Sequence, residues 1–233
     1  KQKKRFNKKL FIPKDANVTV KKRIRESLQK AELIGQIQGE EIPSIVNDTY
    51  NASVIMLLNI EIDDLKNAYF MNGILQELLK SFAIIRYSDT KGNAVLGFGY
   101  KRLSKVEQGE IVIEDYFVTE SFTEHLFNEI NSLFENYIYF DRLKNTTNKL
   151  ALYSEIMVKA YVISNKNLWS KWQSIIDSNI WYNQSNTMKI FDILKEIKEI
   201  KNKQSKVNNT ADNIKLNKEL MKLYKDTEEL ING

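Results

Sequence analysis

The first long apolar pattern of the chain lies near its N-terminus and has helical spacing. Apolar side chains recur at steps of four and three residues, at Val20, Ile24, Leu28, Ala31 and Ile34. This spacing places them on one face of a helix. Asn17 or Thr19 can cap the helix, and the glycines at 35 and 39 end it. We therefore predict an N-terminal segment, residues 1–44, that consists of an arm and a helix.

The middle of the chain combines strand and helix patterns. Residues 53–62 begin as a continuous apolar run and end in alternation, which is typical of a strand buried first on both faces and then on one. A helical pattern follows at 65–81, with Asp63 or Asp64 as its cap, and strand patterns follow at 82–87, 94–103 and 111–119. Gly92 or Asn93 can adopt a positive φ in the turn at 88–93. These elements predict a β-α-β-β-β unit.

Short connections between the last three strands favour antiparallel neighbours. We therefore predict an α+β fold with a small, mainly antiparallel sheet covered by helices, in a core domain at residues 45–183. Gly97 and Gly99 would let another backbone approach their strand closely.

After Thr119 the pattern is helical, with candidate segments near 123–139, 148–163, 167–182 and 187–205. In the last part, apolar residues follow heptad steps of three and four. We predict a helical hairpin resembling a coiled coil at residues 184–233, with Thr210 or Asp212 capping its second helix; one continuous helix is the alternative. The seam can pack on itself, on the rest of the chain or on a partner helix, and its principal members are Ile190, Ile197, Leu216, Leu220, Leu223 and Leu230.

Positive charge is concentrated at the N-terminus. Residues 1–30 contain 12 Lys+Arg but only two acidic residues, although the whole chain has 35 Lys+Arg and 30 Asp+Glu. A clustered positive segment attracts phosphate polymers or an acidic protein surface; a solvated arm is the alternative. The candidate contacts for nucleic acid or a partner are Lys3, Lys4, Arg5, Lys8, Lys9, Lys14, Lys21, Lys22, Arg23 and Arg25.

Composition excludes several classes of site. The chain has no cysteine and one histidine, His125. Disulfides, iron–sulfur clusters, thiolate zinc sites and sites with two or more histidines are thereby excluded. We expect no metal and no cofactor. No apolar run of 18 residues and no signal peptide is visible, so we expect no membrane association and a cytoplasmic location.

Acidic residues cluster where the first core strand ends. Glu61, Asp63, Asp64 and Lys66 have residue types that could hold Mg²⁺ and position water in a nuclease. However, Asp63 and Asp64 stand where a helix needs caps, and Lys66 falls inside that helix. A nuclease is therefore the alternative hypothesis, and no catalytic residue is assigned.

Aromatic residues accompany lysines in the helical part. Trp169, Trp172 and Trp181, with Lys166 and Lys171, could stack bases beside neutralised phosphates. Aromatic residues at helical spacing are more often part of a core, and we favour that interpretation.

Several short segments together resemble a known family. They are Ile12-Pro-Lys14, Gly99-Tyr-Lys-Arg102, Asp115-Tyr-Phe-Val-Thr119, Leu152-Tyr153 and Ile214-Lys-Leu-Asn217-Lys-Glu-Leu220. In this order they resemble an uncharacterised bacterial family found beside helicases and DNA methyltransferases in restriction-type defence loci. The resemblance implies an accessory role next to a helicase or methyltransferase subunit, and it carries over no catalytic residue.

These observations lead to one functional hypothesis and two alternatives. We expect a non-enzymatic accessory subunit of a nucleic-acid-directed defence assembly, which binds DNA or RNA, a partner protein, or both. The alternatives are a Mg²⁺-dependent nuclease and a structural homo-oligomer joined through the C-terminal helices.

Overall fold

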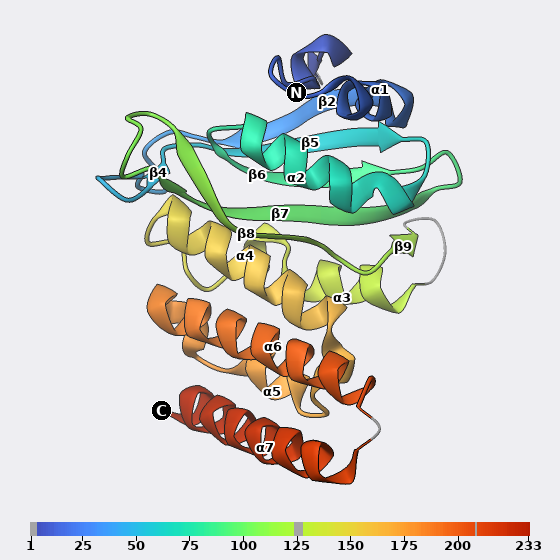
Figure 1. Ribbon diagram of the computed structural model, residues 1–233. Coiled ribbons are helices and arrows are strands. Elements are labelled where there is room, and N and C mark those ends of the chain that lie inside the picture. The colour runs from blue at the N-terminus through green and yellow to red at the C-terminus, as the bar shows by residue number, and fades with distance from the viewer. Residues whose placement is uncertain (1–3, 124–127, 208) are drawn as a thin grey trace. The chain divides into compact units, whose positions relative to one another are not determined.

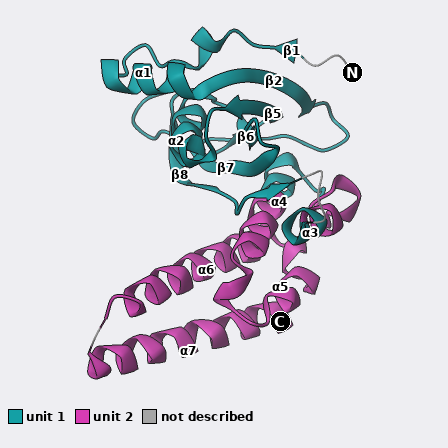
Figure 2. Cartoon of the chain, turned by 90° about the vertical axis from the view of Figure 1, so that its right-hand side faces the viewer, with its two compact units in different colours: residues 1–133, 146–153 teal, residues 134–145, 154–233 magenta. Residues whose placement is uncertain are grey.

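The computed structural model describes residues 4–123, 128–207 and 209–233, which fall into two compact units. Unit 1 comprises residues 1–133 and 146–153, and unit 2 comprises residues 134–145 and 154–233 (Figure 2). The boundaries of these units differ from those of the three segments expected from the sequence.

A mixed sheet dominates unit 1 (Figure 1). In the described residues, six strands follow the order β1-β2-β5-β6-β7-β8, and β9 also pairs with β7. Only β5 and β6 are parallel neighbours among these pairs. The predicted α+β class with a mainly antiparallel sheet is confirmed. The strands are β1 (Lys4–Arg5), β2 (Leu28–Ile37), β5 (Ile55–Ile62), β6 (Phe82–Ser88), β7 (Asn93–Leu103), β8 (Ile111–Val118) and β9 (Phe122–Thr123), with β3 (Ile45–Val46) and β4 (Asn51–Ala52) paired separately.

The helices of unit 1 follow from the connections that the strands need. Two parallel strands require a crossover, and η2 (Leu65–Asn67) with α2 (Ala68–Leu78) supplies it between β5 and β6. The carboxylate of Asp64 caps η2 by accepting from the backbone N–H of Lys66, as one of the two predicted caps would. Met71 and Leu75 of α2 are fully buried in the core of the unit.

Glycines in β7 make room for polar side chains of α2. A Cβ atom at Gly97 would lie 2.4 Å from Oδ1 of Asn72, and one at Gly99 would lie 2.8 Å from Cγ of Gln76. Asn72 uses its position to donate to the carbonyls of Phe98 and Phe117. The expectation that another backbone approaches these glycines is therefore wrong, because helix side chains occupy the space.

The predicted helix near residues 20–34 is wrong in its second half. Helix α1 (Val18–Ser27) is capped by Asn17, one of the two predicted caps, but the chain continues as strand β2. An irregularity between Leu28 and Lys30 inserts one extra residue, so Leu28 faces Ile62 and Ala31 faces Ile60 of β5. A bulge thus gives a strand the three-residue spacing that a helix would have.

Unit 2 consists of helices. Helices α3 (Glu129–Tyr137) and α4 (Lys149–Ser164) each contribute residues to both units. The predicted helix at 167–182 is wrong, since three short helices with breaks between them replace it. The other helices are η3 (Phe140–Arg142), η4 (Lys166–Leu168), α5 (Trp172–Asp177), η5 (Ile180–Tyr182), α6 (Gln184–Gln204) and α7 (Thr210–Asn232). Among the residues described, none of the helices has the length and apolar content needed to cross a bilayer.

Helices α6 and α7 are separate and lie side by side (Figure 2). The alternative of one continuous helix is therefore wrong. Asn209 caps α7, not Thr210 or Asp212, by accepting from the backbone N–H of Ala211. Gln204 Nε2 donates to Asn217 Oδ1 between the helices at 2.7 Å. Of the predicted seam, Ile190, Ile197, Leu220 and Leu223 are buried in the chain, and Leu216 and Leu230 are half-buried.

Candidate functional site

The basic N-terminal segment is folded onto unit 1. β1 pairs with β2, and the ring of Phe11 is buried beside that of Phe6, 5.7 Å between centroids. Asn7 caps η1 (Lys8–Phe11), which turns the chain toward α1. The apolar side chains of this segment therefore anchor it, while its cations remain at the surface.

Two adjoining hollows lie between this segment and α1. Their volumes are about 270 Å³ and 400 Å³, and they share Lys9, Ile12 and Arg25. Together we call them the basic groove. Its apolar lining includes the buried Ile24 and Leu28. Its cationic lining comprises Lys8, Lys9, Lys14, Lys21 and Arg25, and no acidic residue is among the described residues that line it.

The cations of the groove form no ion pair with any acidic residue that the structure describes. Within the described part of the chain, Lys8, Lys9, Lys14 and Arg25 form no ion pair, and all four are exposed. Lys21 directs its ammonium group to the carbonyl oxygen of Lys14 at 2.5 Å. A surface with five positive charges and no compensating carboxylate creates a positive potential that attracts anions.

The other predicted basic residues that the structure describes do not line this groove. Lys22 pairs with Glu26 at 3.8 Å. The Arg23 guanidinium donates to Asn67 and lies 3.9 Å from the centroid of the Phe70 ring. The exposed Lys4 and Arg5 belong to β1, and Lys3 lies outside the described residues.

The predicted acidic group serves the local structure. Asp63 accepts a hydrogen bond from Asn67, and Asp64 caps η2. Lys66 is 90% exposed and lies 3.9 Å from Asp64, whereas Glu61 faces Lys30 across β2 and β5. In the described ranges, no three carboxylate or histidine side chains gather as a metal site would require. His125 falls outside those ranges.

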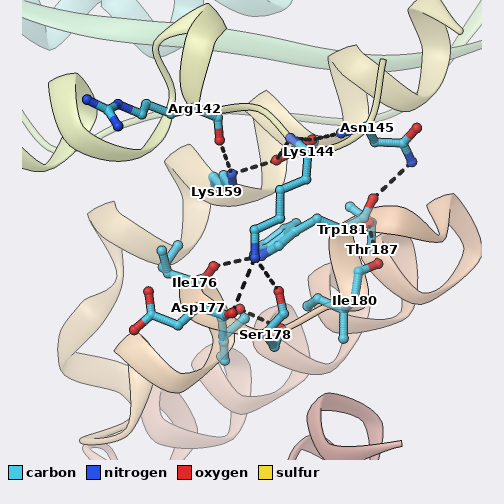
Figure 3. Close-up of polar contacts among 12 residues, drawn as sticks. Arg142, Lys144, Asn145, Lys159, Ile176, Asp177, Ser178, Ile180, Trp181 and Thr187 are labelled. Atoms are coloured by element: carbon cyan, nitrogen blue, oxygen red, sulfur yellow. Dashed lines mark hydrogen bonds and ion pairs between the residues drawn. The ribbon is translucent and has the colours of Figure 1, made fainter. Parts of the chain in front are cut away.

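A buried polar network in unit 2 has no counterpart in the sequence predictions. The Glu155 carboxylate accepts from the backbone N–H groups of Lys144 and Asn145 at 2.7–2.9 Å and pairs with Lys159. Lys159 also donates to the carbonyl of Arg142 (Figure 3). Burial lowers the pKa of Lys159, and the neighbouring Glu155 opposes this effect.

The same network fixes the short helices of unit 2. The Lys144 ammonium group donates to the carbonyls of Asp177 and Ser178, and Asn145 donates to that of Trp181 (Figure 3). The indole N–H of Trp181 donates to the carbonyl of Ile176. These bonds satisfy buried polar groups inside the protein, so the network is suited to holding chain segments in place. Its signal in the sequence is the Glu155–Lys159 pair at i,i+4 within a mostly apolar helix.

Comparisons with known proteins identify the family. Residues 1–226 match the family described as Domain of unknown function (DUF4391), and the chain belongs to this family. Neither the curated proteins nor the solved structures contain a match.

Proposed function

We propose that this member of the DUF4391 family is a non-enzymatic accessory protein that binds nucleic acid through the basic groove. The observation that carries the proposal is the set of exposed cations in the groove, Lys8, Lys9, Lys14 and Arg25, which no described acidic side chain neutralises. Phosphate groups are the natural partners of such cations, because binding releases the counterions condensed on the polymer.

The groove suits contact with a nucleic-acid backbone rather than with base edges. Lysine and arginine contacts to phosphate orient a protein on the polymer but carry no sequence information. An accessory role fits this chemistry, since a partner would supply sequence selection or catalysis. The resemblance to a family found beside helicases and DNA methyltransferases suggests such a subunit as the partner.

Helix α7 offers a surface for that partner. Ile214 and Met221 lie one heptad apart, and they are 52% and 67% exposed. A residue pair at this spacing lies on one helix face. We propose that this face docks protein, and that Met221→Lys abolishes co-purification with a helicase or methyltransferase from the native host. Unchanged co-purification would contradict this part of the proposal.

The test of nucleic-acid binding is a salt series with short duplex and single-stranded DNA and RNA. The groove variant replaces four cations by glutamine, at Lys8, Lys9, Lys14 and Arg25. The control variant removes the same charge at exposed lysines elsewhere, Lys91, Lys105, Lys218 and Lys222. Both lower the formal net charge from +5 to +1, so a non-specific charge effect changes them equally.

The two variants should give different salt dependences. Log K falls with log salt by about 0.9 per phosphate neutralised on duplex DNA, so four groove contacts contribute a slope of about −3.6. We expect the groove variant to lose most of this slope and the control to keep it. Equal slopes for both variants, or no binding by the wild type, would overturn the proposal. Deletion of residues 1–30 is unsuitable, because it removes Phe11, Ile24 and Leu28 from the core.

A further inference from the structure

Another hollow, apart from the two of the basic groove, lies wholly within unit 2, where η4 and α5 meet α6 and α7 (units coloured in Figure 2). Its volume is about 610 Å³, within the range of small-molecule sites. Three aromatic residues and two lysines line it, and none of its described lining residues is acidic. We call it the aromatic pocket, and the residues that matter are Lys166, Trp169, Trp172, Lys201 and Tyr224.

The walls of the aromatic pocket are held in place. The carbonyl of Leu168 accepts hydrogen bonds from both the Tyr224 hydroxyl and the Lys201 ammonium group. The rings of Trp169 and Tyr224 are nearly parallel, with an angle of 12° and 6.2 Å between their centroids. Because these contacts tie η4 to α6 and α7, a ligand would meet walls that are already ordered, which lowers the entropy cost of binding.

Not all of the aromatic residues and lysines that the sequence analysis grouped together line the aromatic pocket. Trp181 is fully buried in the core and lines no part of the pocket. Lys171 forms an ion pair with Glu228 instead. Trp169 is 7% exposed and forms a wall, whereas Trp172 is half-buried and more accessible.

We infer that the aromatic pocket binds a nucleobase that carries a phosphate group. The half-buried Trp172 offers a π face on which a planar base can stack, the Trp169 and Tyr224 rings form the wall beside it, and the lysines offer positive charge for the phosphate. An ammonium group has three donors, and Lys201 directs hydrogen bonds to the carbonyls of Asn167 and Leu168. The source is a free nucleotide or one unit of a single strand, and both present the same chemistry.

The test is isothermal titration calorimetry of the whole chain with AMP, adenosine and a short oligodeoxyadenylate. We expect AMP or the oligonucleotide to bind, and adenosine to bind at least tenfold more weakly because it lacks the phosphate. Binding of AMP identifies a nucleotide site, and binding of the oligonucleotide alone identifies a strand site. If neither AMP nor the oligonucleotide binds up to millimolar concentration, the inference is overturned. Equal affinities for adenosine and AMP would show that the pocket does not recognise the phosphate group, which would overturn that part of the inference.

Substitutions locate the binding. Trp172→Ala should weaken it by roughly 5- to 150-fold, the effect of losing one base–aromatic stack. Lys166→Gln should weaken the binding of AMP but not that of adenosine. Tyr182→Ala, which removes an aromatic side chain that is 62% exposed outside the pocket, is the matched control and should change nothing. Trp172→Phe should retain most of the binding, and it serves as the test if the alanine variant does not fold.

The same variants keep this inference separate from the function proposed for the groove. The four-residue groove variant should bind AMP like the wild type, and Trp172→Ala should retain the steep salt dependence on duplex DNA. Loss of AMP binding in the groove variant would place the nucleotide in unit 1 and overturn the inference.

Discussion

The hydroxyl group of Tyr153 closes a gap in the main sheet, and its removal should be costly. The paired residues of β6 and β7 run from Ile85 opposite Gly97 to Ser88 opposite Ala94. Beyond this ladder, the Tyr153 hydroxyl accepts from the Gly99 N–H at 3.0 Å and lies 3.0 Å from the Gly99 carbonyl and 3.3 Å from the Ala83 carbonyl. One side chain therefore takes the place of a missing strand contact.

The structure sets the magnitude for Tyr153→Phe. Tyr153 is fully buried, so water cannot reach the Gly99 N–H that loses its acceptor. A buried, unsatisfied donor costs about 1–3 kcal/mol, and the lost bond to a carbonyl adds about 1 kcal/mol. We expect the free energy of unfolding to fall by about 2–4 kcal/mol. Burial also raises the pKa of the hydroxyl, so it remains protonated over the ordinary pH range.

Tyr87→Phe is the matched control. Tyr87 is equally buried, but its hydroxyl makes one long contact, 3.4 Å to Asn72 Oδ1. Asn72 Oδ1 still accepts from Gln76 in that variant, so the expected cost is below about 1 kcal/mol.

The assay is urea unfolding followed by far-UV circular dichroism, together with hydrogen exchange at the Gly99 amide. Tryptophan fluorescence is a useful comparison, because Trp169, Trp172 and Trp181 all belong to unit 2, whereas Tyr153 belongs to unit 1. Tyr153→Phe should accelerate exchange at Gly99 and Tyr87→Phe should not. If the two variants lose the same stability, the reasoning about the sheet gap is refuted.

Three further perturbations test the interior. Burial lowers the pKa of Lys101 to about 7, so between pH 7 and 10.5 the unfolded state binds more protons and stability should rise with pH, by up to about 5 kcal/mol. In urea unfolding, the free energy of unfolding should rise with pH for the wild type but not for Lys101→Met. The same pH dependence in both proteins would contradict its assignment to Lys101. Glu155→Ala should lower the free energy of unfolding by about 3–5 kcal/mol, because it leaves Lys159 buried without its carboxylate partner. The double variant Glu155→Ala with Lys159→Met should lose less stability than the two single variants summed. Additive losses in urea unfolding would argue against coupling between the two residues. Gly97→Ala should lower the free energy of unfolding by about 1–3 kcal/mol, measured by thermal unfolding, since the new Cβ would clash with the buried side-chain amide of Asn72. Unchanged stability would show that α2 can shift.

Local pattern was enough to predict the centre of unit 1. The predicted strands at 53–62, 82–87, 94–103 and 111–119 correspond to β5, β6, β7 and β8, and the predicted helix at 65–81 contains α2. In β5 and β6 the buried residues alternate along most of the strand, so the apolar periodicity of the sequence matches the buried face. The cap at Asp64 and the positive φ of Gly92 are equally local, since they depend on neighbouring backbone alone.

The basic groove depends both on the composition of the sequence and on the tertiary structure. Composition alone identified the cluster of cations near the N-terminus. Which of them act together depends on the fold, because η1 and α1 bring Lys8 and Lys9 beside Arg25 while Lys22 and Arg23 find other neighbours. Charge is visible in a sequence, but the position of a compensating carboxylate or amide is not.

The sequence by itself determined the fold class, the elements with an uninterrupted apolar face and the location of the positive charge. Only the tertiary structure decided that residues 28–37 form a strand, because the bulge after Leu28 and the pairing with β5 override a helical spacing. It also decided the break between α5 and η5, where Lys144 donates to the carbonyl of Ser178 and Asn145 donates to that of Trp181, each more than 30 residues away. Such contacts join positions distant in the chain, and no local pattern records them.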